Sequence, residues 1–371
     1  MKILVLSSHT VSMFWFRMDM MKVFISSGCS VVAVGQESAE KWEDQFNEIG
    51  VKYRQIYVER NGINPFNDLR TLKSIKKILT EEKPNKIFAY QAKTVIYGGI
   101  AARKTGISEF YPLIAGLGSV FRGDGLKNAV LKIILKKQYK TACKNSKAVI
   151  FQNNDDRRQF TENNIVNIEK THIINGSGVD LVKFVPCELP KTPSFLFIGR
   201  LIKDKGIMEY LEACRRIKMS SPDVNCMLVG PFDSNPSALK KSELQPFIDD
   251  NIITYYGEQA DVREFLNSCT VYILPSYHEG TPKTILEAMA TGRAVITTDA
   301  PGCRETVTDN ENGFLVPVKN VSQIVEKMQY FIDFPDFAMK MGKKSRIIAE
   351  EKYDVNKVNI AILNIMNIQS R

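Results

Sequence analysis

The sequence predicts an α/β protein of two doubly wound, Rossmann-like domains, each built on a parallel sheet. Its 371 residues exceed what a single hydrophobic core usually serves, so two domains are the natural expectation. Short apolar runs alternate with helical patterns, which is typical of parallel strands covered by helices on both faces. This alternation occurs twice, and a glycine-rich stretch at residues 175–180 separates the two halves.

Eight apolar runs have the length and boundaries of buried strands. They lie at residues 3–7, 31–34, 87–90 and 148–151 in the first half, and at residues 195–198, 226–229, 271–274 and 294–297 in the second. We therefore expect one domain at residues 1–174, another at 175–354 and a final helix at about 355–371. Sheets of this kind bind ligands beyond the carboxyl ends of their strands, so functional residues are expected in the loops that follow them.

The composition is that of a globular chain with an excess of basic residues. It is 44% hydrophobic and 25% charged, with a formal net charge of +9 and a pI near 9.0. Such a charge favours a nucleic acid, an anionic membrane or a phosphorylated substrate without choosing among them. Seven scattered cysteines with no C-x-x-C spacing indicate a reducing cytosol. The N-terminal apolar run is too short for a secretory signal, and no segment approaches the roughly 20 apolar residues of a membrane span.

The most informative segment is residues 275–290, where Glu279 precedes a predicted helix and Glu287 lies inside it, seven residues apart. We expect Thr281 to cap this helix and Pro282 to occupy its first turn, where a proline loses no needed N–H. Backbone N–H groups and the positive end of the helix dipole can then hold an anion such as a diphosphate. The residues of this expected cradle are Gly280, Thr281, Pro282, Lys283 and Thr284.

A second segment complements the first, because an apolar strand ends at Gly199 and two cations follow it around a turn. Arg200 offers a planar fork for phosphate oxygens, and Lys205 offers a mobile point charge. Each cation alone would be read as a solvated surface residue. Together with the two glutamates, they predict a site for a nucleoside diphosphate that leaves without the help of a metal ion.

These motifs resemble those of the retaining glycosyltransferases of family 4, which have the two-domain GT-B fold. The segments at residues 175–184 and 298–305 support the resemblance, which covers nearly the whole chain. It implies a GT-B architecture with the two sheets facing across a cleft, and a final helix that packs back on the first domain. Segments at residues 16–18, 64–66, 97–98 and 116–119 resemble the branch that includes the PglA-type N-acetylgalactosaminyltransferases, which extend polyprenyl-diphosphate-linked sugars.

The resemblance implies roles for residues of the donor site. Arg200, Lys205 and Glu279 would be the catalytic residues, with Glu279 near the transferred sugar. Glu287 would accept hydrogen bonds from the ribose diol, a task suited to a carboxylate. The implied donor-binding set is Gly199, Arg200, Lys205, Tyr256, Gly257, Glu279, Gly280, Thr281, Pro282, Lys283, Thr284 and Glu287.

Plainer interpretations remain open for several of these residues. Glu287 could be a buried acid satisfied by backbone amides, and Glu279 an acid that only complements the helix dipole. Tyr256 and Gly257, which resemble the segment that meets the nucleobase, could form an ordinary strand exit. Arg304 and Glu305 could approach the donor or form a surface ion pair of little energetic value.

Acceptor-side residues are expected in the first domain, where the sequence departs from the family pattern. The loop at residues 8–13 has no glycine, so either a backbone N–H near Ser12 still serves the donor phosphates or this domain contributes less to phosphate binding than is usual in the family. No histidine follows the strand at residues 87–90. We expect the acceptor to be bound by Ser12, Arg17, Gln91, Lys93, Gly116, Gly118 and Ser119. The alternative for the glycine segment is an ordinary turn.

Residues 126–147 carry seven lysines and no acid, interleaved with apolar residues. Such a helix can lie on an anionic membrane through Lys127, Lys132, Lys136, Lys137, Lys140 and Lys144, or it can simply cover a sheet. We expect a cytoplasmic protein at the inner face of the membrane. Nucleic acid is not an expected partner, because the lysines lack interleaved exposed aromatics.

The predicted activity is transfer of a hexosyl or N-acetylhexosaminyl unit from a nucleotide diphosphate sugar, with UDP favoured, to a lipid-linked glycan. Retention of anomeric configuration is expected, with no permanently bound cofactor and no metal. Two alternatives stay open: a UDP-sugar 2-epimerase of the same fold, and a catalytically silent scaffold that binds nucleotide sugars. A dehydrogenase is a poorer candidate, because no G-x-G-x-x-G follows the first strand.

Overall fold

The computed structural model describes residues 1–59, 64–117, 125–233 and 237–369. Contacts divide the chain into two compact units. Unit 1 comprises Met1–Ser177 and Val358–Arg371, and unit 2 comprises Gly178–Lys357. The division therefore falls within the glycine-rich stretch at residues 175–180.

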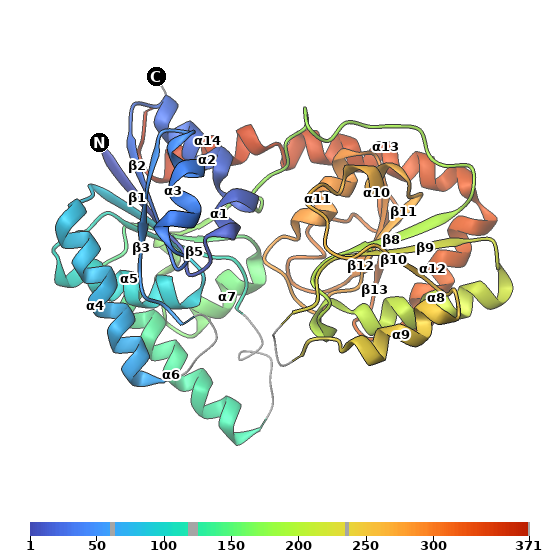
Figure 1. Cartoon of the computed structure of the whole chain (residues 1–371), viewed down its shortest axis with the longest axis horizontal. Coiled ribbons are helices and arrows are strands. Elements are labelled where there is room, and N and C mark those ends of the chain that lie inside the picture. The colour runs from blue at the N-terminus through green and yellow to red at the C-terminus, as the bar shows by residue number, and fades with distance from the viewer. Residues whose placement is uncertain (60–63, 118–124, 234–236, 370–371) are drawn as a thin grey trace. The chain divides into compact units, whose positions relative to one another are not determined.

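Unit 1 is built on a seven-stranded parallel sheet with the order β3-β2-β1-β4-β5-β6-β7 (Figure 1). Its strands are β1 (Lys2–Leu6), β2 (Ser30–Gly35), β3 (Val51–Gln55), β4 (Lys86–Tyr90), β5 (Phe110–Ile114), β6 (Val149–Phe151) and β7 (Thr171–Ile173). Its helices are α1 (Val11–Phe16), α2 (Met18–Ser26), α3 (Ala39–Asn47), α4 (Pro65–Glu82), α5 (Ala92–Lys104), α6 (Leu126–Cys143) and α7 (Asn154–Glu162).

Unit 2 is built on a six-stranded parallel sheet with the order β10-β9-β8-β11-β12-β13. Its strands are β8 (Ser194–Ile198), β9 (Asn225–Val229), β10 (Thr254–Tyr255), β11 (Val271–Leu274), β12 (Ala294–Thr298) and β13 (Gly313–Val316). Its helices are α8 (Ile207–Ser220), α9 (Lys241–Asp249), α10 (Arg263–Asn267), α11 (Lys283–Ala290), α12 (Val321–Asp333) and α13 (Pro335–Lys352).

The predicted class of two parallel α/β sheets is confirmed, and all eight predicted strands are present. Five strands lie outside those eight runs: β10 is the strand implied by the possible strand exit at Tyr256, and four escaped the sequence analysis, namely β3, β5, β7 and β13. Three of them, β3, β7 and β13, lie at sheet edges, where a strand does not need a continuous apolar run. The fourth, β5, contains Pro112, which argues against a central strand on sequence grounds.

Each sheet has one point where the strand order reverses. In unit 1 the chain winds outward from β1 through β2 to β3 and then returns to β4 on the other side of β1. In unit 2 it winds from β8 through β9 to β10 and returns to β11 beside β8. Loops diverge at such switch points, which makes them the expected ligand sites of doubly wound sheets.

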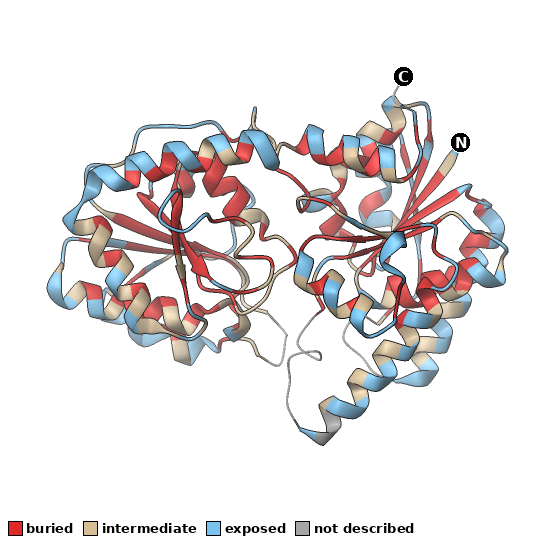
Figure 2. Ribbon diagram, turned by 180° about the vertical axis from the view of Figure 1, so that it is seen from behind, coloured by how far each residue is buried: buried red, intermediate tan, exposed pale blue. Residues whose placement is uncertain are grey.

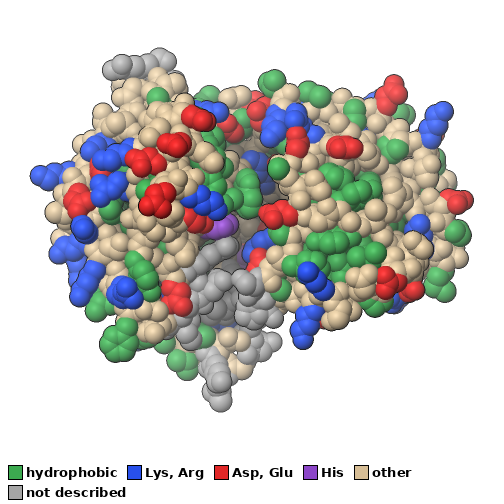
Figure 3. All heavy atoms as spheres, in the orientation of Figure 1, with side chains coloured by type: hydrophobic (Ala, Val, Ile, Leu, Met, Phe, Trp, Pro, Cys, Tyr) green, Lys and Arg blue, Asp and Glu red, His purple; other side chains and the backbone are tan. Residues whose placement is uncertain are grey.

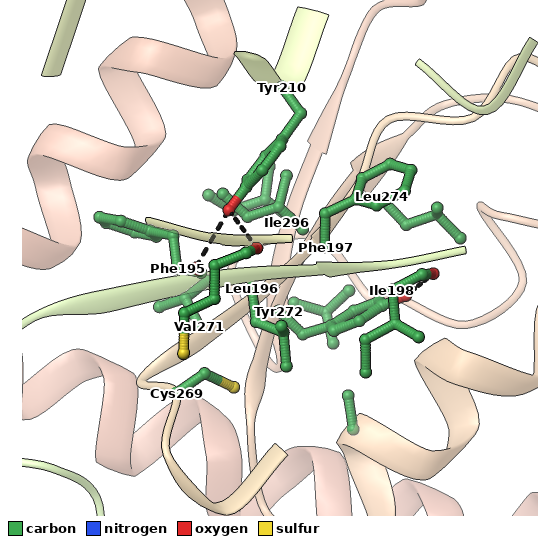
Figure 4. Close-up of a cluster of buried hydrophobic side chains, with 14 of the residues drawn as sticks. Phe195, Leu196, Phe197, Ile198, Tyr210, Cys269, Val271, Tyr272, Leu274 and Ile296 are labelled. Carbon is green, nitrogen blue, oxygen red and sulfur yellow. Dashed lines mark hydrogen bonds between the residues drawn. The ribbon is translucent and has the colours of Figure 1, made fainter. Parts of the chain in front are cut away.

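The sheets are buried on both faces, and the covering helices turn their apolar sides toward them (Figure 2). In unit 2 the core gathers around β8 and β11, where Phe195, Leu196, Tyr272 and Leu274 are fully buried (Figure 4). Tyr210 of α8 places its hydroxyl within hydrogen-bonding distance of two strand carbonyls, 3.1 Å from O of Phe195 and 2.8 Å from O of Met227. This anchoring fixes the strands that carry the candidate site.

The final helix, α14 (Val355–Ile365), joins the core of unit 1. Val358, Ile362, Leu363 and Met366 are at most 3% exposed and pack in the same cluster as the apolar residues of α2. Among the described residues, no helix is both long enough and apolar enough to cross a membrane.

Candidate active site

The loops that follow β8 and β11 bring the predicted donor residues to one edge of the unit 2 sheet. Arg200 lies directly beyond β8, and Lys205 ends a short 3₁₀ helix, η3 (Lys203–Lys205). Glu279 lies in the loop after β11, and Glu287 lies within α11. Because β8 and β11 are neighbours at the switch point, two segments distant in the sequence meet at the same end of the sheet.

An ion pair joins the two loops. Nζ of Lys205 lies 2.5 Å from Oε1 of Glu279, and Oγ of Ser276 donates to the same oxygen at 2.9 Å. The N–H of Tyr277 donates to the carbonyl of Asp204 at 2.9 Å and fastens the loops together. The side chains of Lys205 and Glu279 are only 20% and 15% exposed, so solvent screens this pair less than an ordinary surface ion pair.

Two glycines allow these loops to approach so closely. Gly206 has φ 72°, and a Cβ there would stand 2.1 Å from the carbonyl oxygen of Pro275. Gly302 has φ 81°, and a Cβ there would stand 2.2 Å from the carbonyl oxygen of Glu279. Both positions require a residue without a side chain, because the added atom would overlap backbone that cannot move aside.

Helix α11 begins one residue later than predicted. Its N-cap is Pro282 and its first helical residue is Lys283, with no side-chain cap. The prediction that Thr281 caps the helix is therefore wrong, as is the placement of Pro282 in the first turn. The extended backbone of Pro282 (φ −72°, ψ 111°) suits the N-cap position.

Tyr272, a buried strand residue that the sequence analysis did not single out, positions α11. Its hydroxyl lies 2.7 Å from Oγ1 of Thr284 and 3.0 Å from the carbonyl oxygen of Ile198. One side chain thus ties the end of β8 to the first turn of α11. An apolar run containing a tyrosine was the only sequence signal for this role.

Glu287 is a buried acid without a hydrogen-bond donor among the described residues; it is 8% exposed. Burial raises the pKa of Glu287 to about 7, opposed by the charges of Lys283 and Lys183 and reinforced by that of Asp261. The interpretation that backbone amides satisfy this carboxylate therefore has no support in the structure. An unpaired carboxylate of this kind is suited to accept hydrogen bonds from a ligand.

Arg200 has an acidic partner that the sequence analysis missed. Its Nη1 lies 2.8 Å from Oδ2 of Asp233, in the loop after β9. A Cβ on Gly230 (φ 142°) would stand 1.9 Å from the carbonyl oxygen of Gly199, so the loops after β8 and β9 run in direct contact. No motif marks Asp233, and only the pairing of β8 with β9 brings it to Arg200.

Tyr256 and Gly257 leave β10 at the same end of the sheet. Tyr256 is 38% exposed, and its ring lies 4.8 Å from that of Phe265. Gly257 has φ 71° with open space around its α-carbon, and its carbonyl accepts from the N–H of Gly230 at 2.8 Å. The exposed ring of Tyr256 and the open space at Gly257 would allow a nucleobase to bind here. They are equally expected where a strand ends in a loop.

Arg304 and Glu305 each make a contact within the segment that follows β12. Arg304 donates through Nε to Oδ1 of Asp299 at 2.6 Å, whereas Oε2 of Glu305 accepts from the N–H of Gly302 at 2.8 Å. Glu305 thus holds the turn that presses against the Glu279 backbone.

In unit 1, Gln91 gathers the hydroxyl groups of the β1 loop at the corresponding switch point. Its Oε1 accepts from Oγ of Ser7 at 3.0 Å, from N of Ser8 at 2.9 Å and from Oγ of Ser8 at 2.7 Å. Its Nε2 donates to Oγ of Ser12 at 3.2 Å. Gln91 has φ 72° and ψ 144°, a conformation that non-glycine residues rarely adopt and that is often found at functional sites.

Ser12 is buried within this network. Its N–H donates to the carbonyl of His9 at 3.1 Å, and its Oγ lies 2.8 Å from the hydroxyl of Tyr90. The N–H of Ser12 is thus part of the turn that follows β1.

The remaining acceptor residues are dispersed. Arg17 is 3% exposed, and its guanidinium carbon lies 5.2 Å from the ring centroid of Tyr90 and 5.7 Å from that of Phe88. Burial lowers the pKa of Arg17 to about 10. Lys93 pairs with Asp68 at 2.5 Å. Arg17 thus lies in the core rather than on the loops around Gln91.

Gly116 follows β5 with φ 104°, in the left-handed region that favours glycine. Gly118 and Ser119, which were also assigned to the acceptor, lie outside the described residues.

Helix α6 presents apolar and basic side chains together. Val130, Ile133 and Ile134 are 54%, 55% and 46% exposed. Lys137, Lys140 and Lys144 are also exposed, Lys132 and Lys136 are half-buried, and Lys127 lies in α6. Elsewhere on unit 1 acids and bases are interspersed (Figure 3), as where Lys52 and Arg54 meet Glu82.

Comparison with known proteins agrees with this geometry. Residues 183–347 match the family model described as glycosyl transferases group 1, and residues 2–153 match that described as glycosyl transferase 4-like. The two matches fall on the two units and include every donor residue discussed above. The chain thus carries a match to the group 1 glycosyl transferases in unit 2 and to a glycosyl transferase 4-like family in unit 1.

The names of two curated relatives of this glycosyltransferase describe transfer to lipid-linked substrates. The N,N'-diacetylbacillosaminyl-diphospho-undecaprenol alpha-1,3-N-acetylgalactosaminyltransferase of Campylobacter jejuni is 27% identical over 370 residues, covering 96% of each chain. The UDP-Gal:alpha-D-GlcNAc-diphosphoundecaprenol alpha-1,3-galactosyltransferase of Escherichia coli is 27% identical over 281 residues, covering 72% of this chain and 71% of the relative.

Solved structures identify the fold of this glycosyltransferase as GT-B. A glycosyltransferase from Rickettsia africae superposes with a TM-score of 0.78 at 21% identity, covering 99% of this chain and 97% of that one. The Anabaena protein HepE in complex with UDP gives a TM-score of 0.77 at 17% identity, covering 99% of this chain and all 100% of that one. The comparisons favour neither the epimerase nor the silent scaffold that the sequence left open.

Proposed function

We propose that this glycosyltransferase moves a hexosyl or N-acetylhexosaminyl unit from a UDP-sugar to a glycan carried on a polyprenyl diphosphate, with retention of anomeric configuration. The observation that carries this proposal is the gathering of Arg200, Lys205, Glu279 and Glu287 around the β8–β11 switch point. The names of the relatives support the acceptor class, and the UDP complex of a structural neighbour supports the nucleotide.

Arg200 and Lys205 bind the donor diphosphate in this scheme. Both cations stand at the edge where the N-terminus of α11 also lies, and N–H groups of a first helical turn lack partners within their own helix. The diphosphate would replace the Asp233 carboxylate as the partner of Arg200. At Lys205 it would bind beside the Glu279 carboxylate, which stays in place. Preorganised positive groups of this kind stabilise the negative charge that develops on a leaving phosphate.

Glu287 and Glu279 orient the rest of the donor. The unpaired carboxylate of Glu287 would accept both hydroxyls of the ribose, which would offset the cost of its burial. Tyr256 and Gly257 would contact the nucleobase. Glu279 would face the transferred sugar while its carboxylate keeps its ion pair with Lys205. Gly199, Gly280, Thr281, Pro282, Lys283 and Thr284 complete the proposed donor site.

The acceptor would bind at the unit 1 switch point, where Gln91 and the hydroxyls of the β1 loop lie together. Gly116 follows the neighbouring strand β5. Arg17 and Lys93 would position the neighbouring residues rather than bind the acceptor directly. Arg17 packs on aromatic rings, and Lys93 pairs with Asp68.

The chemical step needs no protein nucleophile in this proposal. The acceptor hydroxyl attacks the anomeric carbon on the face from which the diphosphate departs, and a departing phosphate oxygen takes the proton. Arg200 and Lys205 supply the positive charge that a metal ion would otherwise supply, which makes the proposed reaction metal-independent.

Helix α6 would hold the enzyme against the anionic inner face of the cytoplasmic membrane. Exposed Val130, Ile133 and Ile134 can insert among lipid chains, and the lysines can lie on the headgroups, each contributing about 1 kcal/mol near the surface. Anionic vesicles should sediment the protein. Replacing Lys137 and Lys140 by glutamate should abolish sedimentation without changing soluble donor hydrolysis.

The central experiment incubates purified protein with UDP- and GDP-sugars, with and without a polyprenyl-diphosphate-linked acceptor, in the presence and absence of EDTA. We expect UDP release that depends on the acceptor, resists EDTA and yields a product whose NMR couplings show retention. Arg200→Ala should lose transfer, whereas Lys203→Ala should retain it, because Lys203 pairs with Glu243 at the surface. Equal activity of both variants, or inversion at the anomeric carbon, would contradict the proposal.

A further inference from the structure

Cys187 is the one exposed cysteine of the chain; the other six are buried. It lies in unit 2, in the extended segment that precedes β8, and its Sγ is in hydrogen-bonding contact with Nη2 of Arg293. Arg293 is fully buried between α11 and β12. The sulfur of an exposed residue therefore touches a buried guanidinium.

No acid neutralises Arg293 within the described part of the chain. Its Nε donates to the carbonyl of Leu266 at 2.8 Å, its Nη2 lies 3.3 Å from the carbonyl oxygen of Asn267, and its Nη1 has no hydrogen-bond partner. A buried charge without a counter-ion is costly, so the site stabilises negative charge on any neighbouring atom that can carry it. The sulfur of Cys187 is such an atom.

Asn267 completes the surroundings of the sulfur. The thiol of Cys187 donates to Oδ1 of Asn267 at 3.2 Å. If the sulfur loses its proton, the Asn267 amide can turn and present its NH₂ group instead, because both ends of an amide form hydrogen bonds. The site thus accommodates the sulfur in either form.

A groove of about 910 Å³ opens beside Cys187. Its lining includes apolar Phe331 and Ile347. The charged lining residues are three cations, Lys191, Lys343 and Arg346, and two acids, Glu188 and Asp336, so the cations are in excess by one. A small molecule attached to the sulfur would find apolar contacts here and positive charges for carboxylate groups.

We propose that Cys187 is a covalent modification site for small disulfides that carry carboxylates. The sulfur of Cys187, as thiolate, attacks one sulfur of the disulfide, so that a protein–small-molecule disulfide forms and the original S–S bond breaks. The leaving thiolate takes the electron pair and gains a proton from water. Cys187 is oxidised, and the leaving half of the reagent is reduced. This inference does not depend on the donor site.

The test uses the anionic disulfide 5,5'-dithiobis(2-nitrobenzoate) on the whole chain at neutral pH, with peptide mapping to locate the adduct. The folded chain should react rapidly at Cys187 alone, at least about threefold faster than Cys187 in the urea-unfolded chain, where Arg293 is no longer adjacent. Cys187→Ser should remove this fast reaction. A folded-state rate equal to or below the unfolded-state rate, or an adduct on another cysteine, would overturn the proposal.

The groove is tested separately with charge variants on the surface. Lys343→Glu should slow the anionic disulfide and leave neutral iodoacetamide unaffected, whereas Lys344→Glu should change neither, because Lys344 pairs with Glu311 and does not line the groove. Equal effects of the two variants on the anionic reagent would exclude the groove as its binding surface.

Discussion

Oε1 of Glu279 receives Nζ of Lys205 and Oγ of Ser276 at once, across a junction between loops that are 74 residues apart in sequence. The lysine is therefore fixed in place before any donor arrives. In the proposed scheme, a charge held in advance beside the departing phosphate would require little reorganisation during the reaction.

Replacing Lys205 by alanine should lower kcat/KM by about 10²-fold or more, because a positioned positive charge at the leaving group is lost. Lys203→Ala provides the matched control, since Lys203 lies in the same 3₁₀ helix but pairs with Glu243 at the surface. Steady-state kinetics with a saturating acceptor will show the difference. Similar losses in both variants would point to damage to the loop rather than to the chemistry.

Replacing Asp233 by asparagine should lower the KM for the donor. The Asp233 carboxylate pairs with Arg200, so in the proposed scheme the diphosphate would have to displace it. The neutral amide retains the shape of the side chain but competes less for the guanidinium. Donor titration by calorimetry checks this directly, and weaker binding in the variant would mean that Asp233 positions Arg200 rather than competing for it.

Replacing Glu287 by glutamine should change how stability depends on pH. Because burial raises the pKa of Glu287 to about 7 from its ordinary value of 4.5, the wild-type chain loses stability as pH rises from about 4.5 to above 7. That loss is on the order of 3 kcal/mol at most, and the glutamine variant should escape it. Urea unfolding at pH 5 and pH 8 measures the effect. Parallel pH profiles would contradict the assigned shift.

The same Glu287 variant should bind UDP-sugars weakly even where it is more stable, because an amide cannot accept from both hydroxyls of a diol through two oxygens. With a 2'-deoxy donor, the difference in donor affinity between the variant and the wild type should be smaller. Calorimetry with both donors separates this effect from any change in stability.

Replacing Gly206 by alanine should destabilise unit 2 far more than replacing Gly257. Both residues have φ near 70°, so both changes carry the same left-handed backbone cost of about 1 kcal/mol. Only at Gly206 would the new Cβ meet backbone, 2.1 Å from the carbonyl oxygen of Pro275. Overlap of this kind adds about 1–3 kcal/mol. Equal melting temperatures for the two variants would show that the loops separate easily.

The sequence predicted the parts of the fold that depend on continuous local signals. Strands buried on both faces, such as residues 195–198 and 271–274, appear as apolar runs, and each was found where predicted. Edge strands such as β3 were missed, because residues such as Lys52 alternate with apolar ones where one side is open. The Thr281 cap was wrong because the chain remains extended through Pro282.

For the candidate site, the sequence indicated the charged residues but not their partners. Arg200 and Lys205 stand in a recognisable segment, whereas Asp233 and Tyr272 have no local signal. Asp233 meets Arg200 only through the pairing of β8 with β9, and Tyr272 meets Thr284 only through the packing of α11. Partners chosen by tertiary structure carry no periodicity or spacing that a single sequence reveals.

The register of β8 with β11, in which Val271 lies beside Phe195 and Tyr272 beside Leu196, has a consequence for how this enzyme matures. In the proposed scheme, donor binding cannot emerge gradually during synthesis on the ribosome, because a nascent chain that ends before the β11 segment has Arg200 and Lys205 but lacks Glu279 and Glu287. Competence for catalysis should appear in a single late step, and fragments cut between residues 206 and 271 should recover activity only when recombined.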